Sequence, residues 1–267
     1  PMTSRRSFLT SATAASITLS ALPSFGAEGK KFRTALIGSG WWGMNILREA
    51  MASGRIQVVA LCDVDETVLS NSVEDVKSET GDEAKGYKDY RDLLAEAKPE
   101  IVIIATPDHW HALQTIACCQ AGAHVLVEKP FAASVAECEE LIELAESRNL
   151  SLMVGHTFLY SAPIQMIKKI IDSGDLGEIR YINSQRLNLG LFQKDINVVW
   201  DLAPHDISII LHLLGRTPDF VNCQGNAHVN PEIEDVTNVS LAFSGNRFAT
   251  VQSSWLEPRK VRQMTFV

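Results

Sequence analysis

The stretch Gly38-Ser39-Gly40-Trp41-Trp42-Gly43 decides the fold of this chain. It follows a short apolar run, Thr34–Ile37, and opens a helical pattern over Met44–Ala52. Spacing of the type G-x-G-x-x-G between a strand and a helix is typical of a turn that binds the pyrophosphate of a dinucleotide. The first glycine permits the tight turn, the second lets the backbone approach the ligand, and the third lets the helix pack on the strand.

An acidic residue, Asp63, stands 20 residues after Gly43, directly beyond the next apolar run. A carboxylate at this place accepts hydrogen bonds from ribose hydroxyls and repels a 2′-phosphate, so the sequence predicts NAD in preference to NADP. Asp65 is the nearest alternative acid. Trp41 and Trp42 are bulky for the loop; we expect them to pack in a core or at a domain interface, although their position also makes them candidates for cofactor contact.

Apolar runs and helical patterns alternate through the first half of the chain. The continuous, β-branched runs predict strands buried in a parallel sheet with helices on both faces, a doubly wound Rossmann domain over residues 28–156. The spacing of Ser134 and Glu137 predicts a capping box for the last helix. The predicted strands are Thr34–Ile37, Gln57–Leu61, Ile101–Ala105, His124–Val127 and Ser151–Val154, and the predicted helices are Met44–Ala52, Thr67–Lys77, Tyr90–Ala97, His111–Gln120 and Ala136–Arg148.

The pattern changes after Gly155 to strands with alternating polarity. It predicts an α+β domain on a mostly antiparallel sheet over residues 157–267. Because Val267 falls inside a predicted strand, we expect this domain to be incomplete at its C-terminal end. The predicted helices are Ala162–Ser173 and Leu202–Leu214, and the predicted strands are Ile179–Leu187, Phe220–Gln224, Thr237–Phe243, Phe248–Trp255 and Val261–Val267.

Two polar clusters leave the fourth and fifth strands, where open α/β sheets bind their ligands. The first contains Thr106-Pro107 and His111, and the second is Glu128-Lys129-Pro130. A residue before proline is held extended, which directs the Lys129 ammonium toward the ligand, although a lysine at a strand end also commonly faces solvent. The spacing of His109 and His111 does not converge on one ion, so we expect no metal site.

A third cluster lies on the helix of the second domain. Asp201 and His205 are four residues apart and share a helix face, where the carboxylate could orient the imidazole and raise its pKa. The alternative is a capping aspartate beside an ordinary surface histidine. Arg186 and Asn188, on the preceding strand, could hold sugar hydroxyls or a phosphate, but packing at the sheet edge explains them equally well.

Composition narrows the class of protein. The chain has 267 residues, 46% of them hydrophobic, and a formal charge of −8 without a basic block, so we expect no nucleic-acid partner. Five cysteines at irregular spacing predict no disulfide framework.

The N-terminal segment predicts export. Arg5-Arg6 precedes a weakly apolar stretch too short to span a membrane, followed by small residues near Ser24 and Gly26. Residues 1–27 resemble a twin-arginine signal peptide, which places the mature protein in the periplasm, without a membrane anchor. An unstructured tail on a cytoplasmic protein is the alternative.

Taken together, Gly38–Gly43, Thr106-Pro107 with His111, Glu128-Lys129-Pro130 and the Asp201…His205 pair resemble the Gfo/Idh/MocA family of NAD(P)-dependent sugar and polyol oxidoreductases. The resemblance covers Phe32 to Val267. It implies that Lys129 contacts substrate and nicotinamide, that His205 acts as the general base beside Asp201, and that the dinucleotide contacts the glycine loop, Asp63, Thr106, Pro107, His111 and Glu128. Family members commonly continue beyond the position of Val267, and a homo-oligomer is expected of the full-length protein.

Three functions remain open at this point. The first is a dehydrogenase that transfers a hydride between the hydroxyl-bearing carbon of a sugar or polyol and nicotinamide. The second is an NAD-dependent glycosidase that uses transient oxidation and regenerates its cofactor in each cycle. The third is a non-catalytic dinucleotide sensor, which the presence of both Lys129 and His205 disfavours.

Overall fold

The computed structural model describes residues 29–190, 192–194 and 196–267. The predicted signal peptide, residues 1–27, lies outside the described residues. The chain forms two units. One contains the described residues up to Val127 together with Ala132–Leu152, and the other contains Glu128–Phe131 and Met153–Val267. The short segment Glu128–Phe131 therefore belongs with the second unit, although it follows a strand of the first.

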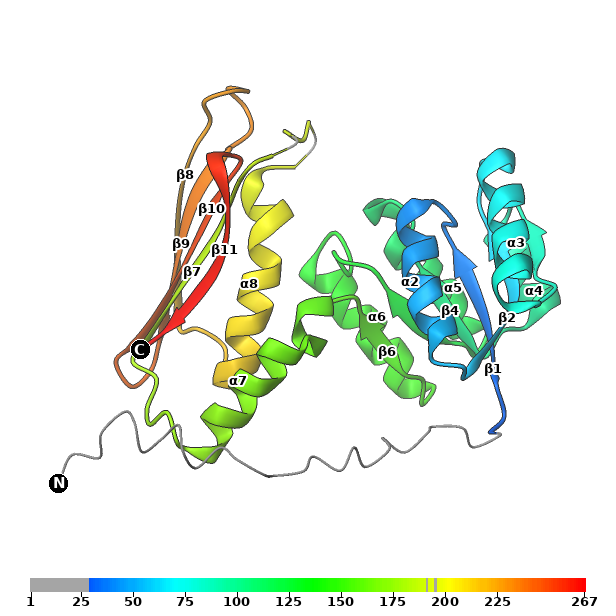
Figure 1. The fold of residues 1–267 in the computed structure, drawn as a ribbon, viewed down its shortest axis with the longest axis horizontal. Coiled ribbons are helices and arrows are strands. Elements are labelled where there is room, and N and C mark those ends of the chain that lie inside the picture. The colour runs from blue at the N-terminus through cyan, green and yellow to red at the C-terminus, as the bar shows by residue number, and fades with distance from the viewer. Residues whose placement is uncertain (1–28, 191, 195) are drawn as a thin grey trace, which may run out of the picture. The chain divides into compact units, whose positions relative to one another are not determined.

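The first unit is built on a six-stranded sheet in the order β3-β2-β1-β4-β5-β6 (Figure 1). Strands β1 to β5 pair in parallel, and the strand order reverses between β1 and β4, which places a ligand site beyond the carboxyl ends of these two strands. The strands are β1 Phe32–Ile37, β2 Ile56–Cys62, β3 Lys85–Tyr87, β4 Ile101–Ile104, β5 His124–Val127 and β6 Leu152–Val154; the helices are α2 Trp41–Ala52, α3 Glu66–Thr80, α4 Tyr90–Ala97, α5 His111–Gln120 and α6 Val135–Ser147, with a 3-10 turn, η1, at Asp108–Trp110.

The predicted doubly wound sheet is confirmed, with two corrections. Strand β3 was not predicted, because its three residues, Lys-Gly-Tyr, carry too little apolar signal to be recognised. Trp41 and Trp42 do not pack in a core: they lie on the first turn of α2 and are 78% and 46% exposed. The Ser134 half of the predicted capping box is confirmed, since the Ser134 side chain accepts a hydrogen bond from the Glu137 amide at the start of α6. The Glu137 carboxylate accepts from the Ala133 amide and not from that of Ser134.

The second unit carries a five-stranded sheet in the order β11-β7-β10-β9-β8. Its pairs are antiparallel except for β7 with β10, so the predicted, mostly antiparallel sheet is confirmed. The strands are β7 Tyr181–Leu189, β8 Phe220–Asn226, β9 Val236–Phe243, β10 Arg247–Ser254 and β11 Leu256–Phe266; the helices are α7 Ala162–Ser173 and α8 Val198–Leu214, with a 3-10 turn, η2, at Thr157–Tyr160.

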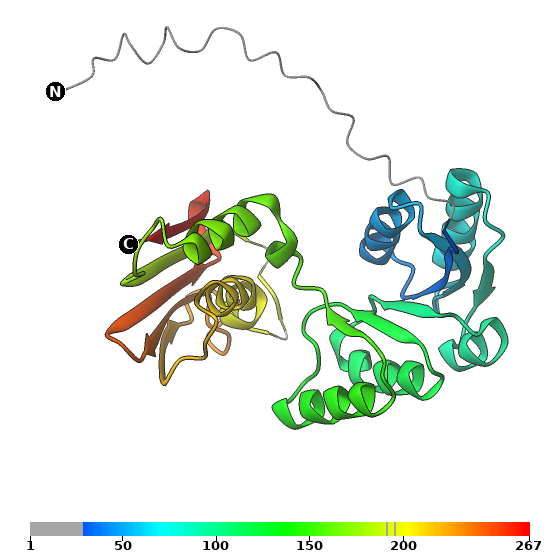
Figure 2. The same cartoon turned by 90° about the horizontal axis from the view of Figure 1, so that it is seen from below.

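Helix α8 covers one face of this sheet, and the turned view shows it end-on (Figures 1 and 2). It begins four residues before the predicted Leu202, because Asn197 caps it by accepting a hydrogen bond from the Trp200 amide at 3.3 Å. Burial of Ala203 and Ile210 against strand residues such as Val251 fixes which side of the helix faces the sheet. That orientation also decides where Asp201, His205 and Asp206 lie. No described helix is both long and apolar enough to span a bilayer.

Candidate functional site

The glycine loop joins β1 to α2 with each glycine in a different steric position. Gly38 has φ +88°, and a Cβ there would lie 2.6 Å from the Ala105 carbonyl oxygen. A Cβ on Gly43 would lie 2.0 Å from the Gly38 carbonyl oxygen, whereas one on Gly40 would meet nothing within 4 Å. Gly38 and Gly43 are therefore required by the fold, and Gly40 leaves open space where a ligand can approach the backbone.

The structure separates the two candidate acids after β2. Asp65 caps α3 and accepts hydrogen bonds from the amides of Thr67 and Val68 at 2.8 and 3.1 Å. Asp63 accepts hydrogen bonds from the amides of Ser39 and Asp65, at 2.9 and 3.0 Å, and lines a cavity beside the glycine loop. Of the two acids, Asp63 is thus the one that lines the cavity, and its contact with a ribose stays a prediction.

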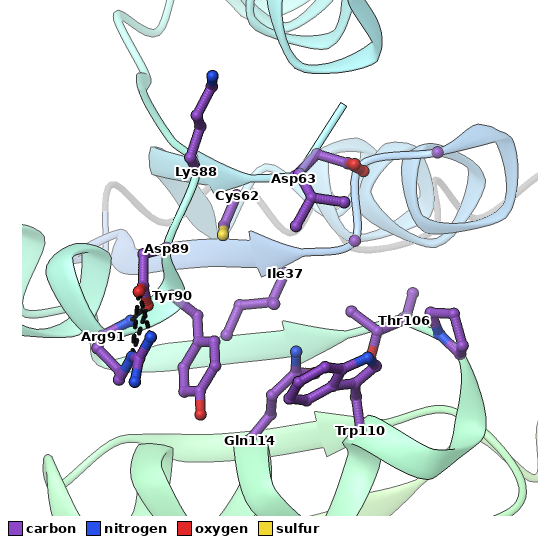
Figure 3. Close-up of a pocket in the computed structure, with 15 residues that line it drawn as sticks. Ile37, Cys62, Asp63, Lys88, Asp89, Tyr90, Arg91, Thr106, Trp110 and Gln114 are labelled. Carbon is purple, nitrogen blue, oxygen red and sulfur yellow. Dashed lines mark hydrogen bonds and ion pairs between the residues drawn. The ribbon is translucent and has the colours of Figure 1, made fainter. Parts of the chain in front are cut away.

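This cavity has a volume of about 620 Å³, within the range of small-molecule sites (Figure 3). It lies beyond the carboxyl ends of β1, β2 and β4. Burial raises the pKa of the Cys62 thiol on its wall to about 12, with Asp63 contributing, so this group stays a neutral thiol. The lining residues are Ile37, Gly38, Gly40, Cys62, Asp63, Val64, Lys88, Asp89, Tyr90, Arg91, Ala105, Thr106, Pro107, Trp110 and Gln114.

Sequence reasoning missed the segment Lys88–Arg91 of this cavity. The segment follows β3, and without that strand its place at the carboxyl edge of the sheet could not be inferred. Figure 3 shows Tyr90 and Trp110 with their rings toward the cavity, and Arg91 bound to Asp89. The hydrogen bonds from Arg91 lower the pKa of the Asp89 carboxyl to about 2. Aromatic rings and an open glycine backbone suit a dinucleotide.

Thr106 and Pro107 line the cavity as their place after β4 predicts. The Thr106 hydroxyl donates to the Gln114 side chain at 2.7 Å. His111 is buried, and its Nε2 lies 2.8 Å from the Thr106 carbonyl oxygen. His111 thus holds the strand-to-helix junction, and it is not among the described residues that line the cavity.

Glu128 and Lys129 lie in the second unit. A Glu128 carboxylate oxygen accepts a hydrogen bond from the Lys129 amide at 3.2 Å. The same carboxylate occupies the space beside Gly155, where a Cβ would come within 2.5 Å of it. Glu128 therefore fixes the segment that carries Lys129, and the glycine that makes room for it gave no signal in the sequence. Direct contact of Glu128 with the dinucleotide stays a prediction.

His205 lies half-buried on α8, with its ring edge-to-face against Phe158 at 5.0 Å between centroids. Its Nδ1 is buried and has no hydrogen-bond partner among the residues that the structure describes. Burial lowers the pKa of His205 to about 3, with contributions from Arg186, Lys129, His156 and Arg262. The imidazole is therefore neutral at physiological pH and can accept a proton.

The predicted pairing of Asp201 with His205 is wrong. Asp201 Oδ2 instead accepts a hydrogen bond from the indole nitrogen of buried Trp255 at 3.1 Å. The pKa of His205 is lowered by burial and nearby cations, not raised by Asp201 as the spacing suggested. A shared helix face brought the two residues into one neighbourhood, but the fold supplied a different partner for the carboxylate.

His156, which the sequence did not single out, belongs to the same neighbourhood. Its Nδ1 is buried and has no hydrogen-bond partner within the described part of the chain. Burial lowers its pKa, and Lys129 lowers it further. Its position directly after Gly155, at the end of β6, was the available signal.

Arg186 is buried and forms a two-pronged ion pair with Asp206, at 2.6 and 3.0 Å. Its guanidinium carbon also lies 4.8 Å from the centre of the Phe158 ring. Asn188 accepts a hydrogen bond from Arg262 at 2.9 Å. Contact of Arg186 and Asn188 with a substrate stays a prediction. Among the described residues, no three His, Cys, Asp or Glu side chains gather as a metal site would need.

Comparison with protein families matches both units. Residues 32–156 match the Gfo/Idh/MocA model, described as an oxidoreductase family with an NAD-binding Rossmann fold, and residues 164–267 match the C-terminal domain of the same family. The NAD in that description fits the glycine loop, Asp63 and the cavity between them.

Three related proteins illustrate the similarity. A 1-carboxy-3-chloro-3,4-dihydroxycyclohexa-1,5-diene dehydrogenase of Comamonas testosteroni is 29% identical over 83% of this chain and 57% of its own length. An inositol 2-dehydrogenase of Salmonella paratyphi B is 30% identical over 69% of this chain and 55% of its own. A crystal structure of an Agrobacterium radiobacter oxidoreductase with NAD+, L-tartaric acid and magnesium shares the fold, with a TM-score of 0.76, 22% identity, and coverage of 88% and 70% of the two chains. The chain spans less than three-fifths of these two curated relatives.

Proposed function

The chain belongs to the Gfo/Idh/MocA family of oxidoreductases, and on that premise we propose that it transfers a hydride between a hydroxyl-bearing carbon of a sugar or polyol and NAD. The observation that carries the proposal is the state of His205, a neutral imidazole near enough to Lys129 for that ammonium to lower its pKa. Bound NAD supplies the hydride acceptor. The two named relatives, both dehydrogenases of hydroxylated rings, support this substrate class.

His205 is proposed to take the proton of the reacting hydroxyl. A general base must be deprotonated before the reaction, and burial among cations keeps this imidazole in that form. The edge contact with Phe158 restricts the ring, so that the accepting nitrogen keeps one direction.

Lys129 is proposed to bind the same substrate oxygen. An ammonium stabilises negative charge that develops on the oxygen as its proton leaves, and it positions the substrate in addition. Glu128 serves this role by fixing the backbone amide of Lys129. Asp201, anchored through Trp255, is proposed to orient the substrate with its second carboxylate oxygen.

Export through the twin-arginine route and assembly of the full-length protein into a homo-oligomer are part of the proposal. Both are supported by the sequence alone, through Arg5 and Arg6 and through the resemblance. Because twin-arginine export moves folded proteins, the enzyme would carry its cofactor with it.

The decisive experiment compares NADH formation by the full-length protein and by two variants on a panel of sugars and polyols. His205→Ala should lower turnover by about 10²- to 10⁴-fold, the scale of a positioned proton-transfer group. Lys129→Met should reduce turnover and weaken substrate binding together. His205→Ala should leave NAD affinity, measured by calorimetry, largely unchanged. Near-normal turnover of His205→Ala would contradict the assignment of the base. Release of a leaving group without accumulation of NADH would favour the glycosidase.

A further inference from the structure

Arg262 is an exposed residue on β11, the edge strand of the second unit's sheet, and none of the described carboxylates pairs with it. It lies on β11 directly opposite Arg186 of β7 in the antiparallel register, so the two side chains project from the same face. Arg186 is neutralised by Asp206. Arg262 donates only to neutral acceptors, Asn188 Oδ1 at 2.9 Å and the Val261 carbonyl at 3.2 Å, and forms no ion pair among the described residues.

Arg262 is one of the charged groups that influence His205. Three cations, Lys129, Arg186 and Arg262, act on its imidazole. The carboxylates of Asp206 and Asp201 act in turn on Arg262, yet the pKa of Arg262 is lowered, because burial and the nearby Arg186 outweigh both acids. Arg186 has its counter-ion in Asp206, whereas Arg262 has no ion-pair partner among the described residues.

We propose that Arg262, with Asn188 beside it, binds a carboxylate of the substrate whose reacting hydroxyl is at His205, so that this protein acts on a hydroxy acid of the sugar-acid class. The inference rests on the proposed function for the role of His205. The choice of Arg262 as the carboxylate-binding residue depends on its position opposite Arg186 and on the lack of an ion-pair partner among the described residues.

The geometry favours a carboxylate over a phosphate. The planar guanidinium matches either group through two parallel hydrogen bonds. Arg262, however, carries one positive charge and has no ion-pair partner among the described residues, which suits a monoanion, and the nearby Asp201 repels a dianion more strongly. A carboxylate here would also offset the cations that depress the pKa of His205, so binding the acid would make the imidazole a stronger base for the hydroxyl of that same molecule.

The test uses three ligands that differ only at one carbon: D-glucose, D-glucuronate and D-glucose 6-phosphate. Their binding to the NAD-loaded chain is measured by calorimetry or by ligand-detected NMR. Glucuronate should bind at least about tenfold more tightly than glucose, the usual scale of a charge-assisted pair. Arg262→Gln should remove that preference without weakening glucose, and Arg262→Lys should restore part of it.

Arg259→Gln is the matched control. Arg259 is exposed on the same strand, and its replacement removes the same charge, so it should leave the preference for glucuronate within about twofold. Equal affinity for glucose and glucuronate, a preference that survives Arg262→Gln, or no detectable binding of any of the three would overturn the carboxylate site. Tighter binding of glucose 6-phosphate would replace carboxylate by phosphate. NAD affinity, measured separately, distinguishes these outcomes from failure of the proposed function, which would show as loss of NAD binding or of hydride transfer.

Discussion

Asp63 and Asp65 show how two like residues, two positions apart, acquire different tasks. The Asp65 carboxylate accepts hydrogen bonds from the first amides of α3. Asp63 is oriented by the amides of Ser39 and Asp65 and faces the cavity. The spacing from the glycines favoured Asp63 over Asp65, and in the structure Asp65 caps α3 instead.

Replacing Asp63 with serine should relax the preference for NAD, because the repulsion of a 2′-phosphate is removed. We expect the ratio of the NADP and NAD dissociation constants to fall by about tenfold or more. Asp65→Ser removes the same charge but keeps a capping hydroxyl, so it should leave the ratio largely unchanged. Calorimetric titration of both variants decides the matter, and a wild-type protein that binds NADP more tightly would refute the role of Asp63.

The buried imidazole of His205 should make the folded state sensitive to acid. Its pKa is about 3 when folded and 6.5 in the reference state, so the unfolded chain binds a proton at a pH where the folded chain does not. Stability therefore falls as the pH drops from about 6.5 toward 3. His205→Asn should lose less stability than the wild type between pH 7 and pH 4.5 in urea unfolding, while His109→Asn, at an exposed site, should behave like the wild type. An equal loss in all three proteins would contradict the burial of a neutral His205.

At the scale of the element, the loop between β1 and α2 divides its glycines between folding and binding. Gly43 is in contact with the backbone of Gly38, whereas Gly40 faces open space with φ −66°, a value open to any residue. Glycine thus meets two different requirements in this loop: Gly43 avoids a steric clash within the chain, and Gly40 leaves room for a ligand beside the backbone.

Alanine substitutions should separate these two requirements. Gly40→Ala should keep the free energy of unfolding but weaken NAD binding at least about tenfold, because a methyl group blocks approach to the backbone. Gly43→Ala should cost about 1–3 kcal/mol or more of stability, since its Cβ would overlap a carbonyl oxygen. Chemical unfolding and NAD titration of both variants are the measurements. A Gly40→Ala protein that binds NAD normally would show that the ligand does not approach there.

A buried ion pair ties β7 to α8. Asp206→Ala should destabilise the second unit by about 3–5 kcal/mol, because the charge of Arg186 is left buried without a partner. The double variant Arg186→Met with Asp206→Leu should recover much of that loss, since it removes both charges. Urea unfolding followed by tryptophan fluorescence compares the two. A single variant as stable as the wild type would show that the pair is accessible to water.

At the scale of the whole molecule, the chain combines a dinucleotide-binding unit with a unit that carries the proposed base. Lys129 is part of the second unit, because the segment Glu128–Phe131, which follows β5, groups with Met153–Val267. The chain therefore passes from the first unit to the second, back to the first and again to the second. The sequence pattern instead predicted two domains that follow one another along the chain.

The prediction of export concerns the N-terminal segment with Arg5 and Arg6. Changing Arg5 and Arg6 to lysine should retain the protein in the cytoplasm with its N-terminal segment uncleaved, because the paired arginines are the recognition element of the signal. Cell fractionation and mass determination of the N-terminus measure this result. A wild-type protein found intact in the cytoplasm would reject the signal and favour the unstructured tail.

The sequence by itself determined the parallel sheet, the place of the glycine loop and the acid that follows it. These features depend on periodicity and steric rules that act over a few residues, from a φ that only glycine readily adopts to a cap three residues away. Even there, β3 escaped prediction because three residues carry no measurable period.

Only the tertiary structure decided which charges meet around His205. Asp201 is bound by Trp255, 54 positions along the chain, and Arg186 by Asp206, 20 positions away. Arg262 stands opposite Arg186 through the register of two strands. Such partners depend on how strands align and on which face of α8 is buried, and a hydrogen bond or an ion pair is fixed by distances of about 3 Å that local spacing does not encode.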